Sequence, residues 1–384
     1  MNKKWLAFTD QVKAHYQMDF VPLHEPTFNG KELEYVTDCI QTGWVSSVGA
    51  YVNRFEEDLA RFTGVRRAVA VVNGTAALHI ALKLVGVQAH EEVFMPALTF
   101  VATANAVSYL GAVPHFVDVS EKTLGLDPQK LEAHILAIGE VKNNQLINKK
   151  TGRVIRAVVP MHTFGHAVEL EELQVICEKY HLILVEDAAE SLGTYYKGKQ
   201  TGSFGKVSAI SFNGNKIMTT GGGGAILTDD EALADYAKHI TTTAKVPHRW
   251  EFEHDEVAFN YRLPNINAAL GCAQLEKMPE FIEQKRALTA FYEELVAPLE
   301  GVTLFKEPTN SFSNYWLQTL IIDDTLVRDD VLAFLNDHGV MSRPIWTPLH
   351  KLKPYRDCPR ADLSTIERLN KKIINIPSTP IKEG

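Results

Sequence analysis

Between about residue 65 and residue 230, short apolar runs alternate with longer segments of helical pattern. The runs are rich in Val, Ile and Ala, and they are almost wholly apolar, which is typical of strands covered on both faces. We expect such strands at residues 68–72, 93–95, 113–117, 155–159, 182–185, 208–212 and 225–227. Helical patterns at 75–85, 101–110 and 170–180 lie between several of them, which predicts an α/β domain with a mainly parallel sheet.

The remainder of the chain predicts a second, smaller α/β domain. A charge-rich helical pattern begins near residue 275, and it is followed by strand-like residues 316–322, a helical pattern at 328–337 and strand-like residues 373–376. A length of 384 residues suits two domains. We therefore predict a large domain at 1–275, with an N-terminal arm, and a small domain at 276–384. The polar segment 138–153 is expected to be a surface excursion.

Charge and cysteine usage exclude several classes of protein. The 39 basic residues are outnumbered by 47 acidic ones, so the chain has no electrostatic signature of a nucleic-acid partner. No segment approaches the roughly 18 apolar residues of a membrane helix, and the start of the chain is too polar for a signal peptide. The four cysteines are isolated, which indicates neither a metal site nor a disulfide framework. We expect a cytoplasmic protein without a membrane or nucleic-acid partner.

Carboxylates follow the apolar run 182–185. Glu186, Asp187 and Glu190 stand where that strand is expected to end, and ligands of open α/β sheets bind at this end of the strands. A Glu-Asp pair after a strand is also common in solvated loops, so the pair alone does not indicate a site.

A lysine and four glycines follow the run 208–212. Ser211 and Lys216 precede Gly221 to Gly224, and glycines permit positive φ angles and close approach of the backbone to a ligand. This order differs from a P-loop, in which the glycines precede the lysine, and no G-x-G-x-x-G follows a strand. Nucleotide hydrolysis and dinucleotide binding are therefore disfavoured.

The third segment is the turn Asn73-Gly74-Thr75 between a strand and a helix. The first N–H groups of a helix are free to bind an anion, although simple capping would also account for these residues. The three segments together supply an acid, a lysine and a phosphate cradle, which is the set that pyridoxal 5′-phosphate (PLP) requires.

These segments resemble the DegT-DnrJ-StrS family of PLP-dependent sugar aminotransferases. The resemblance extends from about residue 21 to residue 377 and includes the segments 73–78, 96–106, 187–190, 211–224 and 259–263. It implies fold type I, with a seven-stranded, mainly parallel sheet in the large domain.

The resemblance also implies roles for three ionisable residues. Lys216 would form the Schiff base with PLP and carry the proton between substrate and cofactor, and Asp187 would pair with the pyridine nitrogen. Glu190 stands where the family commonly has Gln, near the phenolic oxygen of the cofactor. Because that oxygen is normally anionic, we expect Glu190 to be protonated or to point elsewhere.

Further positions follow from the same resemblance. Gly74, Thr75 and Ser211 would bind the phosphate, and Phe100 would stack on the ring, with a plain core position as the alternative for Phe100. Asn260 would reach the phosphate of the neighbouring subunit, which implies a homodimer with shared active sites.

Candidate substrate residues are fewer and less distinct. Trp44, His162 and Arg343 lie in segments that border the substrate in the family, and each could equally be scaffold. Because the net charge is −8, the cations for a nucleotide diphosphate must be local, and Arg249, Arg262 and Arg343 are the candidates.

The implied activity is transfer of an amino group from L-glutamate, through the PLP and pyridoxamine phosphate (PMP) forms, to the 4-keto group of a nucleotide-linked deoxysugar. Asn213-Gly214-Asn215 before the lysine resembles the branch that acts on UDP-2-acetamido-2,6-dideoxy-hexos-4-ulose for bacterial surface polysaccharides. A GDP-perosamine synthase and a C-3 aminotransferase remain alternatives. Lys216 disfavours a sugar dehydratase, and Lys216, Asp187 and Ser211 together disfavour a non-catalytic PLP-binding regulator.

Overall fold

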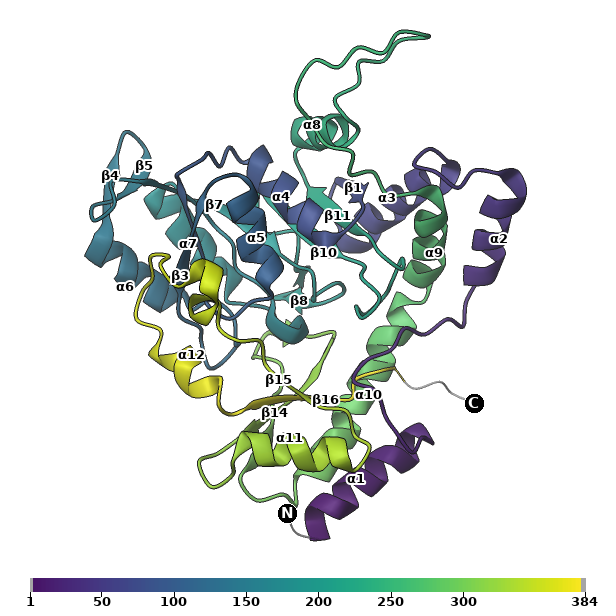
Figure 1. Cartoon of the computed structure of the whole chain (residues 1–384), viewed down its shortest axis with the longest axis vertical. Helices are drawn as coiled ribbons and strands as arrows, with labels where there is room; N and C mark the ends of the chain where they lie inside the picture. The colour runs from purple at the N-terminus through teal and green to yellow at the C-terminus, as the bar shows by residue number, and fades with distance from the viewer. Residues whose placement is uncertain (1–2, 381–384) are drawn as a thin grey trace.

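A nine-stranded sheet forms the centre of the protein, whose computed structural model describes residues 3–380 (Figure 1). The main path of the sheet is β1-β11-β10-β7-β6-β2-β3, and all of its pairings are parallel except those of β11. This confirms the predicted fold class. The strands of this path are β1 (Arg67–Val71), β2 (Glu92–Pro96), β3 (Val113–Val117), β6 (Val154–Val158), β7 (Ile183–Asp187), β10 (Val207–Ser211) and β11 (Gly224–Thr228).

The strands are apolar throughout because helices cover both faces of the sheet. Along β2, Val93 and Met95 belong to one buried cluster and Phe94 belongs to another. The first cluster includes residues of α2 (Glu32–Thr42), α3 (Ala50–Thr63), α4 (Gly74–Leu84), α5 (Val101–Tyr109), α8 (Glu231–Thr241) and α9 (Asn265–Glu276), and further residues from the smaller part of the molecule. The second cluster includes α6 (Pro128–Ile138) and α7 (Leu170–Tyr180).

The polar segment 138–153, which we expected to be a surface excursion, contains regular secondary structure. It forms a hairpin of β4 (Gly139–Lys142) and β5 (Gln145–Asn148), and β5 pairs with the beginning of β6. Asn143 and Asn144 form the turn with φ angles of 50° and 58°. Asparagine tolerates this left-handed region, which two-residue hairpin turns require. The Asn-Asn dipeptide was therefore a hairpin signal.

The smaller part of the molecule contains an antiparallel sheet in the order β12-β14-β16-β15. Its strands are β12 (Val302–Leu304), β14 (Gln318–Ile322), β15 (Arg343–Pro344) and β16 (Ile373–Ile376), and its helices are α10 (Met278–Val296), α11 (Arg328–Asp337) and α12 (Ser364–Leu369). Short elements complete the chain, namely β8 (Tyr195–Tyr196), β9 (Lys199–Gln200), β13 (Ser311–Phe312), η1 (Thr163–Gly165), η2 (Leu349–Lys351) and η3 (Lys353–Tyr355).

The N-terminal helix α1 (Lys3–Tyr16) packs on this smaller part. Its Trp5, Phe8 and Val12 are buried in one cluster with residues of α10, β14 and β16. Figure 1 shows α1 beside α10 and α11, away from the large sheet. The domain boundary at residues 275 and 276 stays a prediction.

A buried carboxylate joins the large sheet to α12. Asp118 follows β3, and its oxygens accept the N–H groups of Thr365 at 2.9 Å and Ile366 at 3.0 Å, at the start of α12. The ammonium group of Lys130 lies 2.7 Å from the same carboxylate. This arrangement fixes the C-terminal helix to the edge of the large sheet.

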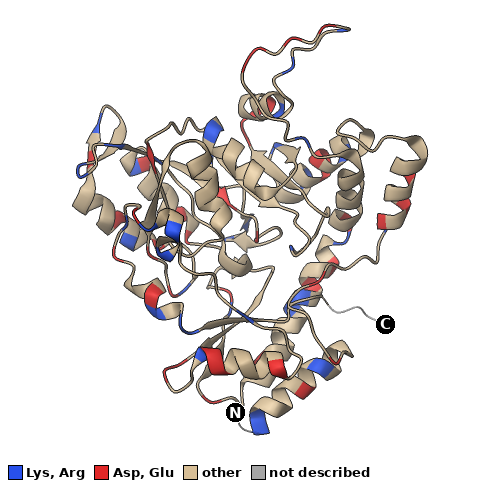
Figure 2. Ribbon diagram, in the orientation of Figure 1, with Lys and Arg blue, Asp and Glu red and all other residues tan. Residues whose placement is uncertain are grey.

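The segment after α8 extends away from the body of the molecule (Figure 1). It carries large exposed apolar side chains, among them Trp250 and Val257. Lys, Arg, Asp and Glu are interspersed over the outer helices (Figure 2). Within residues 3–380, no helix combines the length and apolar character that a membrane span would need.

Candidate active site

A cavity of about 280 Å³ lies at the carboxyl ends of β1, β7 and β10. Parallel strands bring their carboxyl ends to one edge of the sheet, so three segments that are distant in sequence meet there. The cavity is lined by Asn73, Gly74, Thr75, Leu78, Phe100, Ala102, Met161, Asp187, Ala189, Glu190, Ser211, Asn213, Asn215, Lys216, Trp316 and Trp346. Gly74, Thr75, Phe100, Asp187, Glu190, Ser211 and Lys216 were all predicted from the sequence.

Asp187 presents a buried carboxylate to the cavity. Its Oδ2 accepts the hydroxyl of Thr103 at 2.7 Å, and its Oδ1 accepts the N–H of Ala189 at 3.3 Å. Burial raises the pKa of Asp187 because these two hydrogen bonds do not offset the loss of water. A cation in the cavity would favour the charged form of Asp187. The protonated pyridine nitrogen of PLP would be such a cation.

Glu190 points at the amine of Lys216. The Nζ atom of Lys216 lies 3.2 Å from Glu190 Oε1 and 3.9 Å from the centre of the Trp316 ring. Glu190 Oε2 accepts the N–H of Phe164 at 2.9 Å. Burial raises the pKa of Glu190 to about 7. This carboxyl group therefore titrates near neutral pH, and it faces the lysine.

The start of α4 forms the other end of the cavity. The side chain of Asn73 caps the helix by accepting the N–H of Ala76 at 2.8 Å. A Cβ atom added to Gly74 would lie 2.7 Å from Ser211 Cβ, so this close approach requires glycine. Gly224 has the same requirement, because its Cβ would lie 2.6 Å from the backbone of Asn73. The hydroxyl of Ser211 and the first turn of α4 are thus held together as an anion site.

Aromatic rings form the remaining wall. Phe100 lines the cavity and is 52% exposed, and its ring centre lies 6.1 Å from that of Trp346. A flat ring could stack on Phe100 with its phosphate at α4, its ring nitrogen at Asp187 and its aldehyde near Lys216. The residues of the cavity therefore fit PLP.

His162 lies in the core of the protein, and its predicted role toward a substrate stays a prediction. The imidazole is fully buried, with Nε2 3.0 Å from Glu186 Oε2 and Nδ1 accepting the N–H of Val168 at 3.3 Å. Both ring nitrogens are therefore occupied within the protein, and His162 does not line the cavity.

Other predicted residues also lie outside the cavity lining of the single chain. Trp44 is 58% exposed, and Arg249, Asn260 and Arg343 are exposed as well. Arg262 is partly buried, with its backbone paired to Val71 at the end of β1. Their predicted roles toward a substrate or a neighbouring subunit stay predictions.

No site role was predicted for Trp316, Trp346 or Thr103, and Asn73 was named only as part of its turn. Trp346 lies in a segment that the sequence did indicate, and Asn73 is a favourable helix cap before a glycine. Trp316 precedes a strand of the smaller sheet, and no local pattern connects it to Lys216. Only the tertiary fold brings this indole under the amine.

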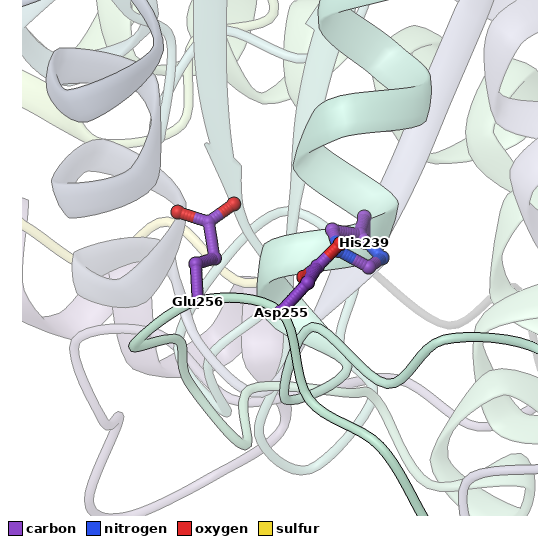
Figure 3. A group of neighbouring side chains, drawn as sticks. All are labelled: His239, Asp255 and Glu256. Carbon is purple, nitrogen blue, oxygen red and sulfur yellow. The ribbon is translucent and has the colours of Figure 1, made fainter.

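One group of potential metal ligands lies outside the cavity. Figure 3 shows His239, Asp255 and Glu256 between the end of α8 and the segment that follows it. The side chains already have partners, since His239 pairs with Asp255 at 2.7 Å and Glu256 accepts the hydroxyl of Tyr236 at 3.1 Å. The prediction that the protein has no metal site stays a prediction.

Comparisons with known proteins identify the family of the chain and several of its relatives. The model of the DegT/DnrJ/EryC1/StrS aminotransferase family matches residues 26–382. EpsN of Bacillus subtilis (strain 168), assigned as a pyridoxal phosphate-dependent aminotransferase, is 40% identical over 328 residues, or 85% of this chain and 82% of EpsN. The GDP-perosamine synthase of Escherichia coli O157:H7 is 35% identical over 363 residues, or 94% of each chain. The structure of DesI with its TDP-sugar product has a TM-score of 0.82 at 29% identity and covers 94% of this chain and 88% of DesI.

Proposed function

The chain belongs to the DegT/DnrJ/EryC1/StrS aminotransferase family, and from this premise we propose that it moves an amino group from L-glutamate to the 4-keto group of a nucleotide-linked deoxysugar. The coarser activity, that of a sugar aminotransferase with PLP as cofactor, agrees with the prediction from the sequence. The observation that carries the proposal is the pairing of the Lys216 amine with the buried Glu190 carboxylate, in the cavity that Asp187 also lines.

When bound, PLP supplies an aldehyde that takes up the amino group and a ring that delocalises the electrons of the substrate carbon. Asp187 would keep the ring nitrogen protonated. Ser211 and the first turn of α4 would bind the phosphate, and Phe100 would cover one face of the ring. The amine of Lys216 would carry a proton between the substrate carbon and the cofactor in each half-reaction.

The identity of the sugar is the finer part of the proposal. We propose UDP-2-acetamido-2,6-dideoxy-hexos-4-ulose, because Asn213-Gly214-Asn215 before Lys216 resembles that branch, and we place the product in the synthesis of a bacterial surface polysaccharide. The main alternative is a GDP-linked 4-keto-6-deoxymannose. It is favoured by relatives named GDP-perosamine synthase, which are 35% and 36% identical to this chain. Amination at C-3 is a further alternative.

A panel of substrates tests this choice. The enzyme would be incubated with PLP, L-glutamate and 4-keto sugars linked to UDP, GDP or dTDP, and mass spectrometry would identify the amino sugar formed. We expect product from the UDP-linked sugar and none from Lys216→Ala, which lacks the amine. Product from the GDP-linked sugar alone would establish the alternative. If no sugar gave a product and glutamate failed to convert bound PLP to PMP, the protein would be a non-catalytic PLP-binding regulator.

We also propose a homodimer in which Asn260 completes the phosphate site of the neighbouring subunit. The exposure of Asn260, Trp250 and Phe252 on the segment after α8 supports this, because such side chains are suited to contact with a second copy. Neither Lys216→Ala nor Asn260→Asp would be active alone. A mixed dimer can place both defects in one site and leave the other site intact, so mixing equal amounts should restore roughly a quarter of the wild-type activity.

Mixtures that exchange subunits and stay inactive would show that Asn260 acts within its own subunit or does not reach the cofactor. The proposed location is the cytoplasm, where the four free cysteines would remain reduced.

A further inference from the structure

The free amine of Lys216 has a defined place in this structure. It lies between the Glu190 carboxylate at 3.2 Å and the Trp316 ring at 3.9 Å, and its side chain is 12% exposed. A carboxylate on one side and an indole face on the other both favour a cation. We refer to Glu190 and Trp316 together as the ammonium site.

Both walls of the ammonium site are fixed by the fold. Asn314 donates its side-chain N–H to the backbone oxygen of Glu190 at 2.9 Å, and its Oδ1 accepts the N–H of Trp316 at 2.9 Å. The indole N–H of Trp316 donates to the backbone oxygen of Asn215 at 2.7 Å. The backbone of Glu190, the indole of Trp316 and the residue before Lys216 are therefore held by one hydrogen-bonded network.

The Trp316 wall is also held from the smaller part of the molecule. Lys285 of α10 is fully buried and donates to the backbone oxygens of Trp316 at 2.9 Å and Ser378 at 2.6 Å. Burial lowers the pKa of Lys285 well below its usual range. A neutral amine would still donate both hydrogen bonds, so Lys285 would fix Trp316 without adding a second positive charge beside Lys216.

We propose that Glu190 and Trp316 hold the protonated amine of Lys216 whenever this lysine is not joined to the cofactor. The inference rests on the proposed function, in which the amine is released and carries a proton during each half-reaction. The Glu190 carboxylate would stabilise the positive charge that the amine gains when it takes up a proton. Glu190 would thus be a counter-ion to the lysine, a role different from that of a partner to the phenolic oxygen of PLP.

Two charged groups and one backbone donor act on Glu190, and they come from three segments. Lys216 follows β10, Asp187 ends β7, and the N–H of Phe164 belongs to η1. Lys216 and Phe164 favour the carboxylate form, while burial and Asp187 oppose it. Because the pKa of Glu190 is about 7, the counter-ion is present at pH 8 and is neutralised by pH 5.5.

Chemical labelling tests the proposal on protein that is free of cofactor and on protein loaded with PMP, in which Lys216 is not joined to the cofactor. A trace of acetic anhydride reacts with neutral amines alone, and mass spectrometry of a digest measures the acetylation of Lys216 against exposed lysines in the same sample. Because the carboxylate lies 3.2 Å from the amine and its charge attracts a cation, Glu190→Gln should increase labelling of Lys216 at pH 8 by roughly tenfold. Trp316→Leu should increase it about twofold to threefold.

Asp187→Asn is the matched control, because it also changes a carboxylate of this cavity to an amide. Asp187 acts on Lys216 only as a more distant charge, so its variant should increase labelling less than Glu190→Gln does. An unchanged or lower labelling of Lys216 in Glu190→Gln would overturn the proposal. If Asp187→Asn increased the labelling of Lys216 as much as Glu190→Gln does, the proposal would also be overturned. The total negative charge of the cavity, and not the contact between Glu190 and Lys216, would then keep labelling low.

A double-mutant cycle gives a second readout. The unfolding equilibrium constants of the wild type, Glu190→Gln, Lys216→Met and the double variant should show about tenfold coupling at pH 8, which disappears at pH 5.5 where Glu190 is neutral. Coupling that is absent at pH 8 would overturn the proposal. Neither measurement uses a sugar substrate, so a wrong sugar assignment would leave both results unchanged.

Discussion

Two consecutive carboxylates on β7 have opposite environments. Glu186 and Asp187 are both buried, and because side chains alternate along a strand they lie on opposite faces of the sheet. Burial opposes the charge of Glu186, but His162 and backbone N–H groups of residues 202–205 outweigh it and hold the pKa of Glu186 below its usual range. Asp187 has two donors, and burial raises its pKa.

The difference separates a carboxylate that serves the fold from one that serves a ligand. Glu186 receives from the protein the hydrogen bonds that a buried anion requires, and it ties the turn at residues 202–205 to the sheet. Asp187 lacks such a set and faces the cavity. Its shortage of donors is the property that a protonated cofactor nitrogen would correct.

Among the variants that test this contrast, Asp187→Asn should have the largest effect. We expect a loss of several orders of magnitude in turnover, because a neutral pyridine stabilises the substrate carbanion poorly. The unfolding free energy of the cofactor-free chain should not decrease, since the variant removes a buried charge with few donors. Steady-state kinetics and urea unfolding measure the two quantities. A variant that unfolds readily and retains turnover would assign Asp187 to the fold.

Glu186→Gln should give the reverse pattern. Its side-chain N–H₂ group would face donors at Gly202, Phe204 or Gly205, so we expect a loss of about 3–5 kcal/mol in the free energy of unfolding. Turnover per folded molecule should stay within a few-fold of the wild type, because Glu186 does not line the cavity. Chemical unfolding and active-site titration with PLP distinguish these effects. Stability equal to that of the wild type would contradict the assignment.

Glu190→Gln should sharpen the contrast through its pH dependence. In the folded, cofactor-free chain Glu190 keeps its proton up to about pH 7, whereas the unfolded chain loses it near pH 4.5. Raising the pH through this window therefore lowers the unfolding free energy of the wild type by up to about 3 kcal/mol, and the glutamine variant lacks this decrease. Urea unfolding at pH 5 and pH 8 should show the variant gaining stability relative to the wild type. A pH-independent difference would disprove the raised pKa.

The smallest effect should be that of Glu190→Gln on turnover at neutral pH. The amide oxygen of the glutamine can still accept the N–H of Phe164, which Glu190 accepts at 2.9 Å. We expect a decrease of about tenfold or less in kcat, smaller than that of Asp187→Asn. Kinetics of the two variants under one set of conditions compares them directly. An equal loss in both would show that the two carboxylates share one role.

The sequence predicted the sheet and the Lys216 segment for physical reasons. Strands covered on both faces are apolar throughout, and the lysine, acid and helix start each follow such a strand. The division of roles between Glu186 and Asp187 was not visible, because it depends on residues 202–205 and on Thr103, which reach β7 only in the folded chain.

Trp316 shows the same limit more strongly. It is 100 positions from Lys216 along the chain, and a buried lysine of α10 holds its backbone. The sequence also did not indicate which way the Glu190 side chain points, and in the structure its carboxylate contacts the Lys216 amine. Local patterns therefore predicted which residues stand at strand ends, but not which of them face one another.

The anchor of α12 on Asp118 has a consequence for the order in which the chain folds. The hydrogen bond from Thr365 to Asp118 spans 247 positions, so α12 can dock only after the edge strand β3 of the large sheet is in place. β16, which lies in the interior of the smaller sheet, follows α12 directly along the chain. Contacts of such long range close large loops and form late. During synthesis, the last strand of the smaller sheet would therefore join its neighbours β14 and β15 after the large sheet has folded.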